Sequence, residues 1–581
     1  MKIPSEWDLT PIYPSCESVE FANDLASVVE GATALETYLK EEGCDLKEAI
    51  DRFESMVDRF SNLYAYASAV LTLNTSNEIA LRAVSRAEEV SLSLERASVS
   101  LMNFLATRSQ EIAERTAAGG DLAAYRYPLS ELLEEQRHLM SAEMEDLAAD
   151  LGRSGGDAFS RLQQAMGSAI SAEWGEDGPK SVVELRNMAS DQDRNVRKKA
   201  YESEINLFEA YEIPFAAALN GVTGTTLTLA KRRKWDSPLD RSLATSRIDR
   251  EILTSLITAI EDNLPNFRRY LKAKATLLGV EELAFYDLFA PVGTHARSYT
   301  YEEAHAFIVK QFSAFSPKIA AFADNAFKKG WIDAFSRPGK VGGAYDTSFP
   351  LAKESRVLSN FDNSFSGVST LAHELGHAWH DSVVLDKPYL LRNYPMTLAE
   401  TASIFSEQLV FQGALKESSE DERITLVEHF LQDSTQVCVD ILSRFYFESA
   451  VYERRGDGDL SAAEFSALME DAQKRTYGDG LGVYHRYMWA AKSHYYSCDF
   501  SFYNYPYAFG LLFALGLFAQ AQEQGSAFFD QYEEILAATG SRSARDVAAL
   551  ASIDLADHHF WDGAMGVINS YIEELVDAAS R

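Results

Sequence analysis

Hydrophobic residues recur every three or four positions along most of this chain, which is the spacing of one face of an α-helix. Within residues 16–171, Phe53, Met56 and Phe60 follow this spacing, and charged residues fill the positions between them. The same spacing returns over residues 191–329. We therefore predict a mainly α-helical protein.

The helical pattern weakens once in the first third of the chain. Residues 175–179 contain two glycines and a proline, which mark a break, and a short run with β propensity follows at residues 181–185. We predict an N-terminal helical lobe over residues 1–190 and a second, larger domain over residues 191–581. The two should be packed together, because the sequence contains no Gly/Ser-rich linker and no visible repeat.

Two segments in the second domain depart from the helical period and are the best strand candidates, namely residues 337–345 and residues 356–361. The first of them contains Gly342 and Gly343. Glycine has no β-carbon, so another backbone can approach it closely, and this pair could mark the place where an extended peptide joins a sheet edge. An ordinary glycine turn is the alternative.

The charge balance narrows the possible partners. The 581 residues include 54 Lys plus Arg and 87 Asp plus Glu, which gives a formal net charge of −33. Such acidity argues against binding to nucleic acid or to an anionic membrane.

Cysteine usage and hydropathy indicate the compartment. The four cysteines are far apart and form no C-x-x-C pair, so neither a disulfide framework nor a thiolate zinc site is expected. The N-terminus carries Glu6 and Asp8 where a signal peptide would be apolar, and the most apolar stretch, residues 505–521, is too short for a membrane helix and contains Pro506. We predict a cytoplasmic protein in which residues 505–521 form a buried helix.

The residues most informative about chemistry form one H-E-x-x-H motif, in which His373 and His377 flank Glu374. On a helix, residues four apart lie on one face about 6 Å apart along the axis, so both imidazoles can bind one zinc ion. Glu374 would lie beside that ion, where a carboxylate can take a proton from water and pass it to a leaving amine. We predict one zinc ion per chain in a catalytic site. A structural zinc ion and a solvated helix face are the alternatives.

A third metal ligand has to come from elsewhere. His380 is displaced about 10 Å along a straight helix from His373, so we expect it to pack nearby or to support the ligands from a second layer. Glu400 and Glu407 lie on one face of a later helical stretch, and one of them could complete the site while Glu407 could orient a ligand histidine. A solvated helix face is again the alternative for both.

A second group of candidates follows His494, where five tyrosines occur within thirteen residues. Hydrolysis of a peptide bond requires donors that stabilise the developing oxyanion, and a tyrosine hydroxyl or a histidine N–H can supply them. A purely aromatic core is the alternative interpretation of this run.

Several separated segments resemble the thimet oligopeptidase and oligoendopeptidase F family of zinc metallopeptidases, and within it the oligoendopeptidase F branch. They extend over nearly the whole chain and comprise residues 7–9, 339–345, 361–365, 373–380, 399–403 and 502–510. The resemblance implies an elongated, two-lobed helical molecule with a deep substrate channel and a small β-sheet near the zinc site. It also implies that a substrate-side segment aligns short peptides, namely Gly342, Gly343, Ala344 and Tyr345.

The resemblance further implies a role for each matching residue of the site. The zinc ligands would be His373, His377 and Glu400, with Glu374 as the general base. His494 and a following tyrosine would stabilise the transition state. The tyrosine spacing differs from that of the thimet branch, so we place Tyr505 first and Tyr503 second, while Tyr496 and Tyr507 stay open.

We therefore predict a zinc-dependent endopeptidase that hydrolyses internal bonds of short oligopeptides, with the catalytic domain over residues 191–581. A metallocarboxypeptidase on a similar helical cleft is one alternative, and a peptide-binding protein without turnover is another.

Overall fold

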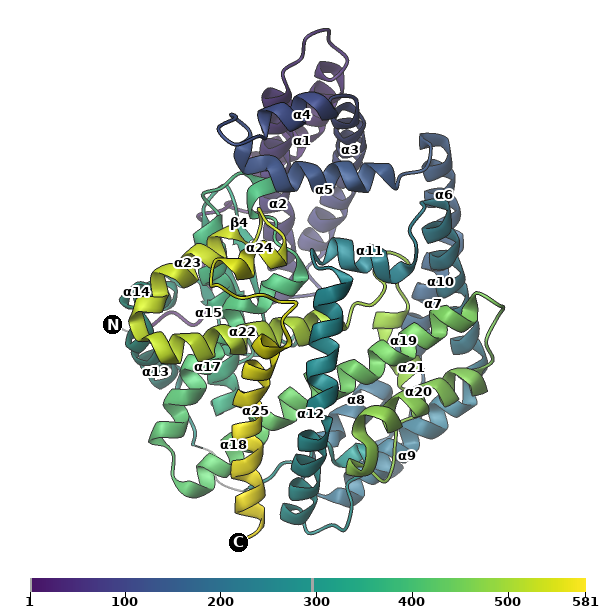
Figure 1. Cartoon of the computed structure of the whole chain (residues 1–581), viewed down its shortest axis with the longest axis vertical. Coiled ribbons are helices and arrows are strands. Elements are labelled where there is room, and N and C mark those ends of the chain that lie inside the picture. The colour runs from purple at the N-terminus through teal and green to yellow at the C-terminus, as the bar shows by residue number, and fades with distance from the viewer. Residues whose placement is uncertain (1–2, 294–296) are drawn as a thin grey trace. The chain divides into compact units, whose positions relative to one another are not determined.

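The computed structural model describes residues 3–293 and 297–581, and helices make up most of it (Figure 1). This confirms the prediction of a mainly α-helical fold with only small sheets. The chain forms two compact units, each assembled from three stretches of sequence. The first unit comprises Met1–Arg137, Ala296–Lys416 and Gln520–Ile553, and the second comprises His138–His295, Glu417–Ala519 and Asp554–Arg581. The division at residue 190 stays a prediction, because it separates the chain along the sequence whereas these units do not.

The first unit begins with a helical layer that packs against a small sheet. Its helices are α1 (Val19–Tyr38), α2 (Leu46–Leu73), α3 (Glu78–Thr107), α4 (Ser109–Arg115), α5 (Arg126–Arg137), α13 (Tyr301–Phe315), α14 (Pro317–Lys328), α15 (Phe365–Val384), α16 (Tyr389–Arg392), α17 (Met396–Glu417), α23 (Phe528–Ala538) and α24 (Ala544–Ala549). Helices α1, α2 and α3 pack side by side, and Figure 1 shows them together in the purple and dark blue part of the chain. Their core, which includes Phe21 and Leu63, is continuous with Phe349 and Leu358 of the sheet.

The sheet has three strands in the order β3 (Ile332–Asp333), β5 (Glu354–Leu358), β4 (Tyr345–Phe349). Strand β4 is antiparallel to β5, with Tyr345 opposite Leu358, and β3 is parallel to β5. Helix α15 packs against β4 and β5. The predicted small sheet beside the H-E-x-x-H helix is therefore present, and β4 forms one of its edges.

The strand boundaries differ from the sequence-based prediction. Residues 337–344 form a loop rather than a strand, because Gly339 and Gly343 adopt left-handed backbone conformations with φ of 88° and 78°. The run at residues 181–185, which has β propensity, is helical after Ser181. Ser181 caps helix α8 (Val182–Asn187) by accepting a hydrogen bond from the backbone N–H of Glu184, so the helix begins directly after it.

The second unit is helical apart from a two-stranded hairpin of β1 (Ser171–Glu173) and β2 (Pro179–Ser181). Its helices are α6 (Ala142–Ser154), α7 (Gly156–Ala169), α8, α9 (Arg194–Ala210), α10 (Glu212–Arg232), α11 (Pro238–Thr245), α12 (Arg250–Leu277), α18 (Glu420–Thr435), α19 (Ile441–Arg455), α20 (Ala462–Tyr477), α21 (Met488–Ala491) and α25 (His558–Ala579). Helices α12 and α25 lie side by side (Figure 1). Helix α22 (Tyr505–Gln524) is largely buried, as predicted for residues 505–521.

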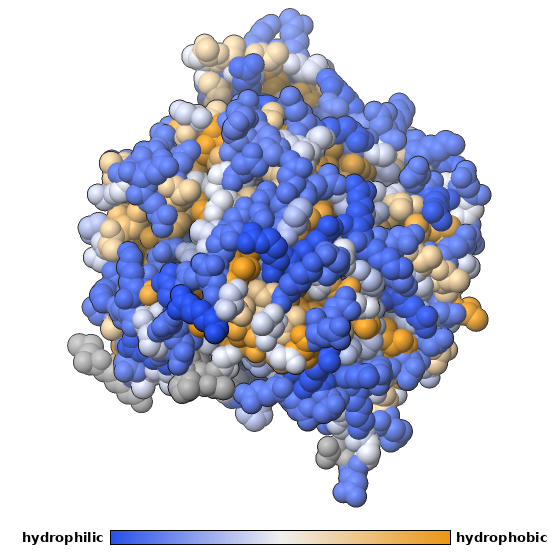
Figure 2. Space-filling model, turned by 60° about the horizontal axis from the view of Figure 1, so that its bottom comes forward, coloured by the Kyte–Doolittle hydropathy of each residue, from blue (hydrophilic) through white to orange (hydrophobic). Residues whose placement is uncertain are grey.

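Polar and charged residues cover most of the face shown in Figure 2, with hydrophobic residues scattered among them. Within the described ranges 3–293 and 297–581, no helix combines the length and the apolar composition that crossing a membrane requires. All four cysteines are free thiols.

Candidate metal centre

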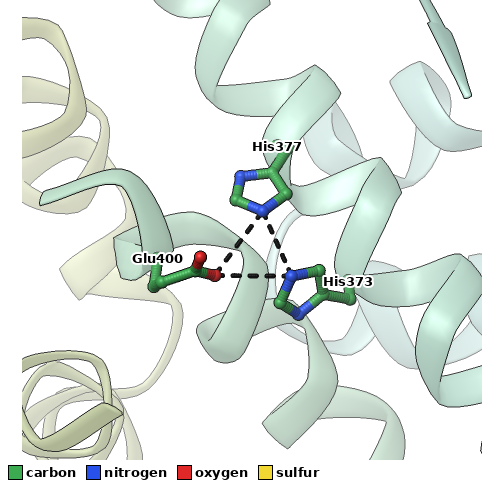
Figure 3. Close-up of side chains that lie close together, drawn as sticks. All are labelled: His373, His377 and Glu400. Carbon is green, nitrogen blue, oxygen red and sulfur yellow. Dashed lines mark hydrogen bonds and ion pairs between the residues drawn. The ribbon is translucent and has the colours of Figure 1, made fainter. Parts of the chain in front are cut away.

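Three predicted ligand side chains converge in the first unit. His373 and His377 lie one turn apart on α15, and Glu400 lies in the first turns of α17. Their side chains point toward one another (Figure 3). The two Nε2 atoms are 3.1 Å apart, and Oε2 of Glu400 is 3.3 Å from Nε2 of His373 and 3.5 Å from Nε2 of His377.

These distances fit a zinc ion. Ligand atoms about 2.0–2.1 Å from a tetrahedral ion lie roughly 3.3 Å from one another, and the three observed separations surround that value. The donor set of two imidazole nitrogens and one carboxylate oxygen is also typical of catalytic zinc sites, which keep a further position open. Within the described residues, this is the one group of three such side chains close enough to hold a metal ion.

The close contact between the two helices depends on Gly376. A β-carbon at this position would lie 2.6 Å from the carbonyl oxygen of Ala402 and 2.6 Å from Cα of Ser403, both on α17. Gly376 therefore lets the backbone of α17 approach α15 closely enough for Glu400 to reach the histidines. The role of this glycine inside the H-E-L-G-H segment was not predicted from the sequence.

We expect Gly376→Ala to weaken zinc binding and to lower the free energy of unfolding by about 1–3 kcal/mol, because the added methyl group forces the two helices apart. Zinc titration and thermal unfolding would measure both effects. Gly167→Ala is the matched control, since a β-carbon at this helical position meets no atom within 4 Å. If Gly376→Ala bound zinc and unfolded like the parent, the close approach would not be needed for the site.

Two further side chains hold the ligands in place. Oγ of Ser403 donates a hydrogen bond of 2.6 Å to Oε2 of Glu400. Glu407, two turns along α17 from Glu400, places Oε1 3.4 Å from Nδ1 of His373, on the side of the ring that faces away from Glu400. A carboxylate in this position fixes the orientation of a ligand histidine. Burial alone would lower the pKa of His373, but Glu407 and Glu400 raise it to about 9.

Glu374 lies beside the three converging side chains and is buried, with 7% of its surface exposed. Burial raises the pKa of its carboxyl group to about 7, and a backbone N–H from Asp346 of β4 donates a hydrogen bond to it. A carboxyl group with a pKa near neutrality can both accept and release a proton at physiological pH. The edge strand thus holds the predicted general base in place.

His380 contacts Tyr394 and Thr539 and does not join the three converging side chains. Its ring is fully buried and stacks on Tyr394 with 4.2 Å between ring centroids, and Nε2 is 2.8 Å from Oγ1 of Thr539. Burial lowers its pKa to about 3, so it is a neutral packing residue. These contacts agree with the packing alternative that its spacing left open.

A buried pair of carboxyl groups lies next to Glu374 and was missed by sequence reasoning. Asp346 of β4 and Asp381 of α15 are hydrogen-bonded to each other, and the hydroxyl of Tyr394 donates to Oδ1 of Asp381 at 2.9 Å. Burial raises the pKa of both acids, so the pair retains a proton that two separate carboxylates would lose. Asp381 is one helical turn beyond His377, and this spacing was the available signal.

The predicted substrate-side segment leads into the sheet edge. The amide Nδ2 of Asn360 donates hydrogen bonds to the carbonyls of Val341 and Gly343, which fixes the loop, and the space where a β-carbon of Gly342 or Gly343 would lie is open. The hydroxyl of Tyr345 is 2.6 Å from Oγ1 of Thr72 on α2. The segment is thus both a turn and the entry to an edge strand, and a role in binding peptides stays a prediction.

The aromatic run belongs to the second unit. The rings of His494, Tyr503 and Tyr507 form a half-buried cluster with centroid separations of 5.5–6.5 Å. Tyr505 is buried instead, and its hydroxyl accepts a hydrogen bond from Ser242 at 3.1 Å and donates one to Ser246 at 3.0 Å. Tyr496 is buried as well. Because the hydroxyl of Tyr505 is occupied, Tyr503 replaces it as the tyrosine that we pair with His494.

Glu448 of α19 forms a hydrogen bond with the backbone of the loop that precedes Tyr503. It is buried, and its Oε1 accepts a hydrogen bond of 2.7 Å from the backbone N–H of Phe502, whose φ is 55°. No group in the described part of the chain donates to its Oε2. Burial raises the pKa of this carboxyl group to about 8.

We expect the free energy of unfolding of Glu448→Gln to fall less than that of the parent as pH rises from 5 to 8. A carboxyl group whose pKa is higher in the folded state contributes its full stability below about pH 4.5 and loses it as pH rises to about 8. The loss is at most about 1.4 kcal/mol per pH unit for one proton, and glutamine has no proton to lose. Urea unfolding from pH 5 to 8 measures it. Glu453→Gln, an exposed change on the same helix, should behave like the parent. Identical pH dependence in Glu448→Gln and the parent would contradict this account.

Comparison with known proteins points to one family. The sequence profile of peptidase family M3 matches residues 187–567, and the profile described as oligopeptidase F matches residues 104–171. Oligopeptidase PepF of Bacillus subtilis (strain 168) is 24% identical over 591 residues, which cover 99% of this chain and 87% of the relative.

Two solved structures share the fold over their full lengths. A candidate peptidase from Chlamydophila abortus superposes with a TM-score of 0.84 at 23% identity, covering 99% of this chain and 98% of that one. Oligoendopeptidase-F from Enterococcus faecium has a TM-score of 0.70 at 20% identity, covering 96% and 98%.

Proposed function

Because the chain belongs to peptidase family M3, we propose that it is a zinc-dependent endopeptidase that hydrolyses internal bonds of short peptides. That it is a peptidase, and that its family is metal-dependent, follows from the family itself. The observation that carries the finer proposal is the convergence of His373, His377 and Glu400 within 3.1–3.5 Å, with buried Glu374 beside them.

His373, His377 and Glu400 would hold the zinc ion. A zinc ion in such a site supplies Lewis acidity, which polarises a carbonyl group and makes water easier to deprotonate. The remaining chemistry belongs to Glu374. Its carboxylate accepts a proton from the attacking water, keeps that proton on an oxygen that the backbone N–H of Asp346 helps to orient, and then delivers it to the departing amide nitrogen.

The peptide substrate requires contacts to its backbone as well. We propose that an extended peptide forms hydrogen bonds along the segment Gly342–Tyr345 and the edge of β4, since β4 has a strand partner on one side only. Hydrogen bonds from His494 and Tyr503 to the carbonyl oxygen are proposed to stabilise the negative charge that develops there.

We place the enzyme in the cytoplasm. Its four free thiols, three of them buried, are compatible with a reducing compartment and would gain nothing from an oxidising one. The proposed partners are short peptides, and neither nucleic acid nor an anionic membrane suits a net charge of −33.

A peptide that is acetylated at one end and amidated at the other tests the position of cleavage. An endopeptidase cuts such a peptide internally, and mass spectrometry then finds two fragments whose masses add up to one hydrolysed substrate. A metallocarboxypeptidase needs a free C-terminal carboxylate, so it would leave the blocked peptide intact and would shorten the unblocked one from its end. That second pattern would refute the endopeptidase proposal while leaving the metal site untouched.

A further inference from the structure

A small cavity in the second unit is surrounded by cationic side chains. It measures about 60 Å³, which is room for about four molecules the size of water. Arg186 of α8, Arg444 of α19 and Lys492, which follows α21, all line it. So do Gln436 and Asp440, the first and last residues of a π-helical turn (Gln436–Asp440), an irregular element that often accompanies functional sites.

The negative charges around the cavity do not balance the positive ones. Asp440 forms an ion pair with Arg444, and Glu204 forms one with Arg186 at 3.1 Å. Lys492 is the third cation, and the two acids whose charges act on its ammonium group, Asp440 and Glu204, are already paired with Arg444 and Arg186. The nearby Lys274 is already paired with Glu428. When Lys492 is protonated, one positive charge is therefore left over at the cavity.

The hydrogen-bond donors are likewise incompletely used. Arg444 is 4% exposed, and no described group accepts a hydrogen bond from its Nε. Its Nη1 donates to Oδ1 of Asn504 at 3.3 Å. A buried guanidinium with an unused N–H is costly unless an acceptor lies beside it.

We propose that this cavity binds one small monovalent anion, with Arg186, Arg444 and Lys492 as its donors. A single negative charge balances the surplus and satisfies the unused donors at once. Without an anion, the surrounding cations disfavour the charged form of Lys492, whose burial lowers its pKa to about 7. Chloride is the probe of choice, because it is small and monovalent.

The position of the cavity suggests what the anion does. Lys492 precedes His494 by two residues, and Asn504, which Arg444 contacts, follows Tyr503 directly. An ion held by Lys492 and Arg444 would thus fix both ends of the loop that carries His494 and Tyr503. This consequence for turnover rests on the proposed function, whereas binding of the anion does not.

Thermal unfolding of the metal-loaded protein tests the binding. At constant ionic strength, replacing gluconate, which is too large for the cavity, by chloride should raise Tm in a saturable way. The increase should be roughly 1–2 °C at about ten times the dissociation constant, because a chain of this length unfolds with a large entropy change. Lys492→Met should abolish the chloride dependence. Lys272→Met, which removes an exposed lysine of α12, should retain it.

Anomalous diffraction from crystals grown in bromide locates the anion without any variant. The proposal therefore stays testable even if Lys492→Met does not fold. An anomalous peak between Arg186, Arg444 and Lys492 is expected. The absence of that peak, a Tm that is independent of halide, or an unchanged halide dependence in Lys492→Met would overturn the proposal. A halide effect on Tm without one on turnover would leave the anion site standing and would refute only its link to the His494 loop.

Discussion

Glu374→Gln should lower the rate of peptide hydrolysis by about 10²–10⁴-fold while the protein still binds about one zinc ion per chain, because glutamine retains the shape of the side chain and cannot carry a proton. The three converging ligand atoms belong to other residues, so their distances of 3.1–3.5 Å need not change. Steady-state kinetics on an internally quenched peptide, together with metal analysis of the same sample, would measure both quantities.

Glu302→Gln is the control for this variant, since Glu302 is exposed in the first turn of α13 and should be replaceable without loss of rate. If Glu374→Gln cleaved peptides at the parent rate, with contaminating protease excluded, Glu374 would not be the general base. Loss of zinc from Glu374→Gln would also count against the account, because it would make this residue part of the binding set.

Glu400→Gln should lose more zinc affinity and more activity than Glu407→Gln. Glu400 places a carboxylate oxygen within 3.3–3.5 Å of both histidine Nε2 atoms, so its replacement should remove a ligand and with it stable zinc binding and activity. Glu407 lies 3.4 Å from Nδ1 of His373, the nitrogen that faces away from the candidate metal position, and its replacement should weaken zinc binding about 10–100-fold. Zinc affinity is measured by competition with a chromophoric chelator.

The relative zinc affinities of these two variants distinguish a zinc ligand from a residue that only orients a ligand. At saturating zinc, Glu407→Gln should recover most of its activity and Glu400→Gln should not. If instead Glu407→Gln lost zinc entirely while Glu400→Gln kept it, the third ligand would be Glu407, which the sequence alone left possible.

The convergence of the candidate metal ligands was largely predictable because its signal is local. The spacing of His373 and His377 follows from the geometry of one helix, and the structure brings both together with Glu400 as the resemblance implied. The position of Glu374 beside them follows from the same helix. The hydrophobic periodicity does not explain why α17 can approach α15. The approach is possible because Gly376 has no side chain.

Other features depend on contacts between residues that are far apart in the sequence. Asp346 and Asp381 are 35 positions apart and meet only because β4 packs on α15, so the spacing of Asp381 from His377 pointed to one of the two residues and not to the pair. Tyr505 was placed first among the tyrosines, although Ser242 and Ser246 occupy its hydroxyl, and those partners come from a separate helix and the residue after it. The compact units likewise interleave three stretches of chain each, which no local pattern records.

The most direct test of the central claim is to remove the metal and restore it. We predict that the protein treated with chelator and then freed of it loses nearly all cleavage of an internally quenched peptide, and that activity returns in proportion to added zinc until one equivalent per chain is bound. A metal-free protein that still cleaved the peptide at the parent rate would contradict the account.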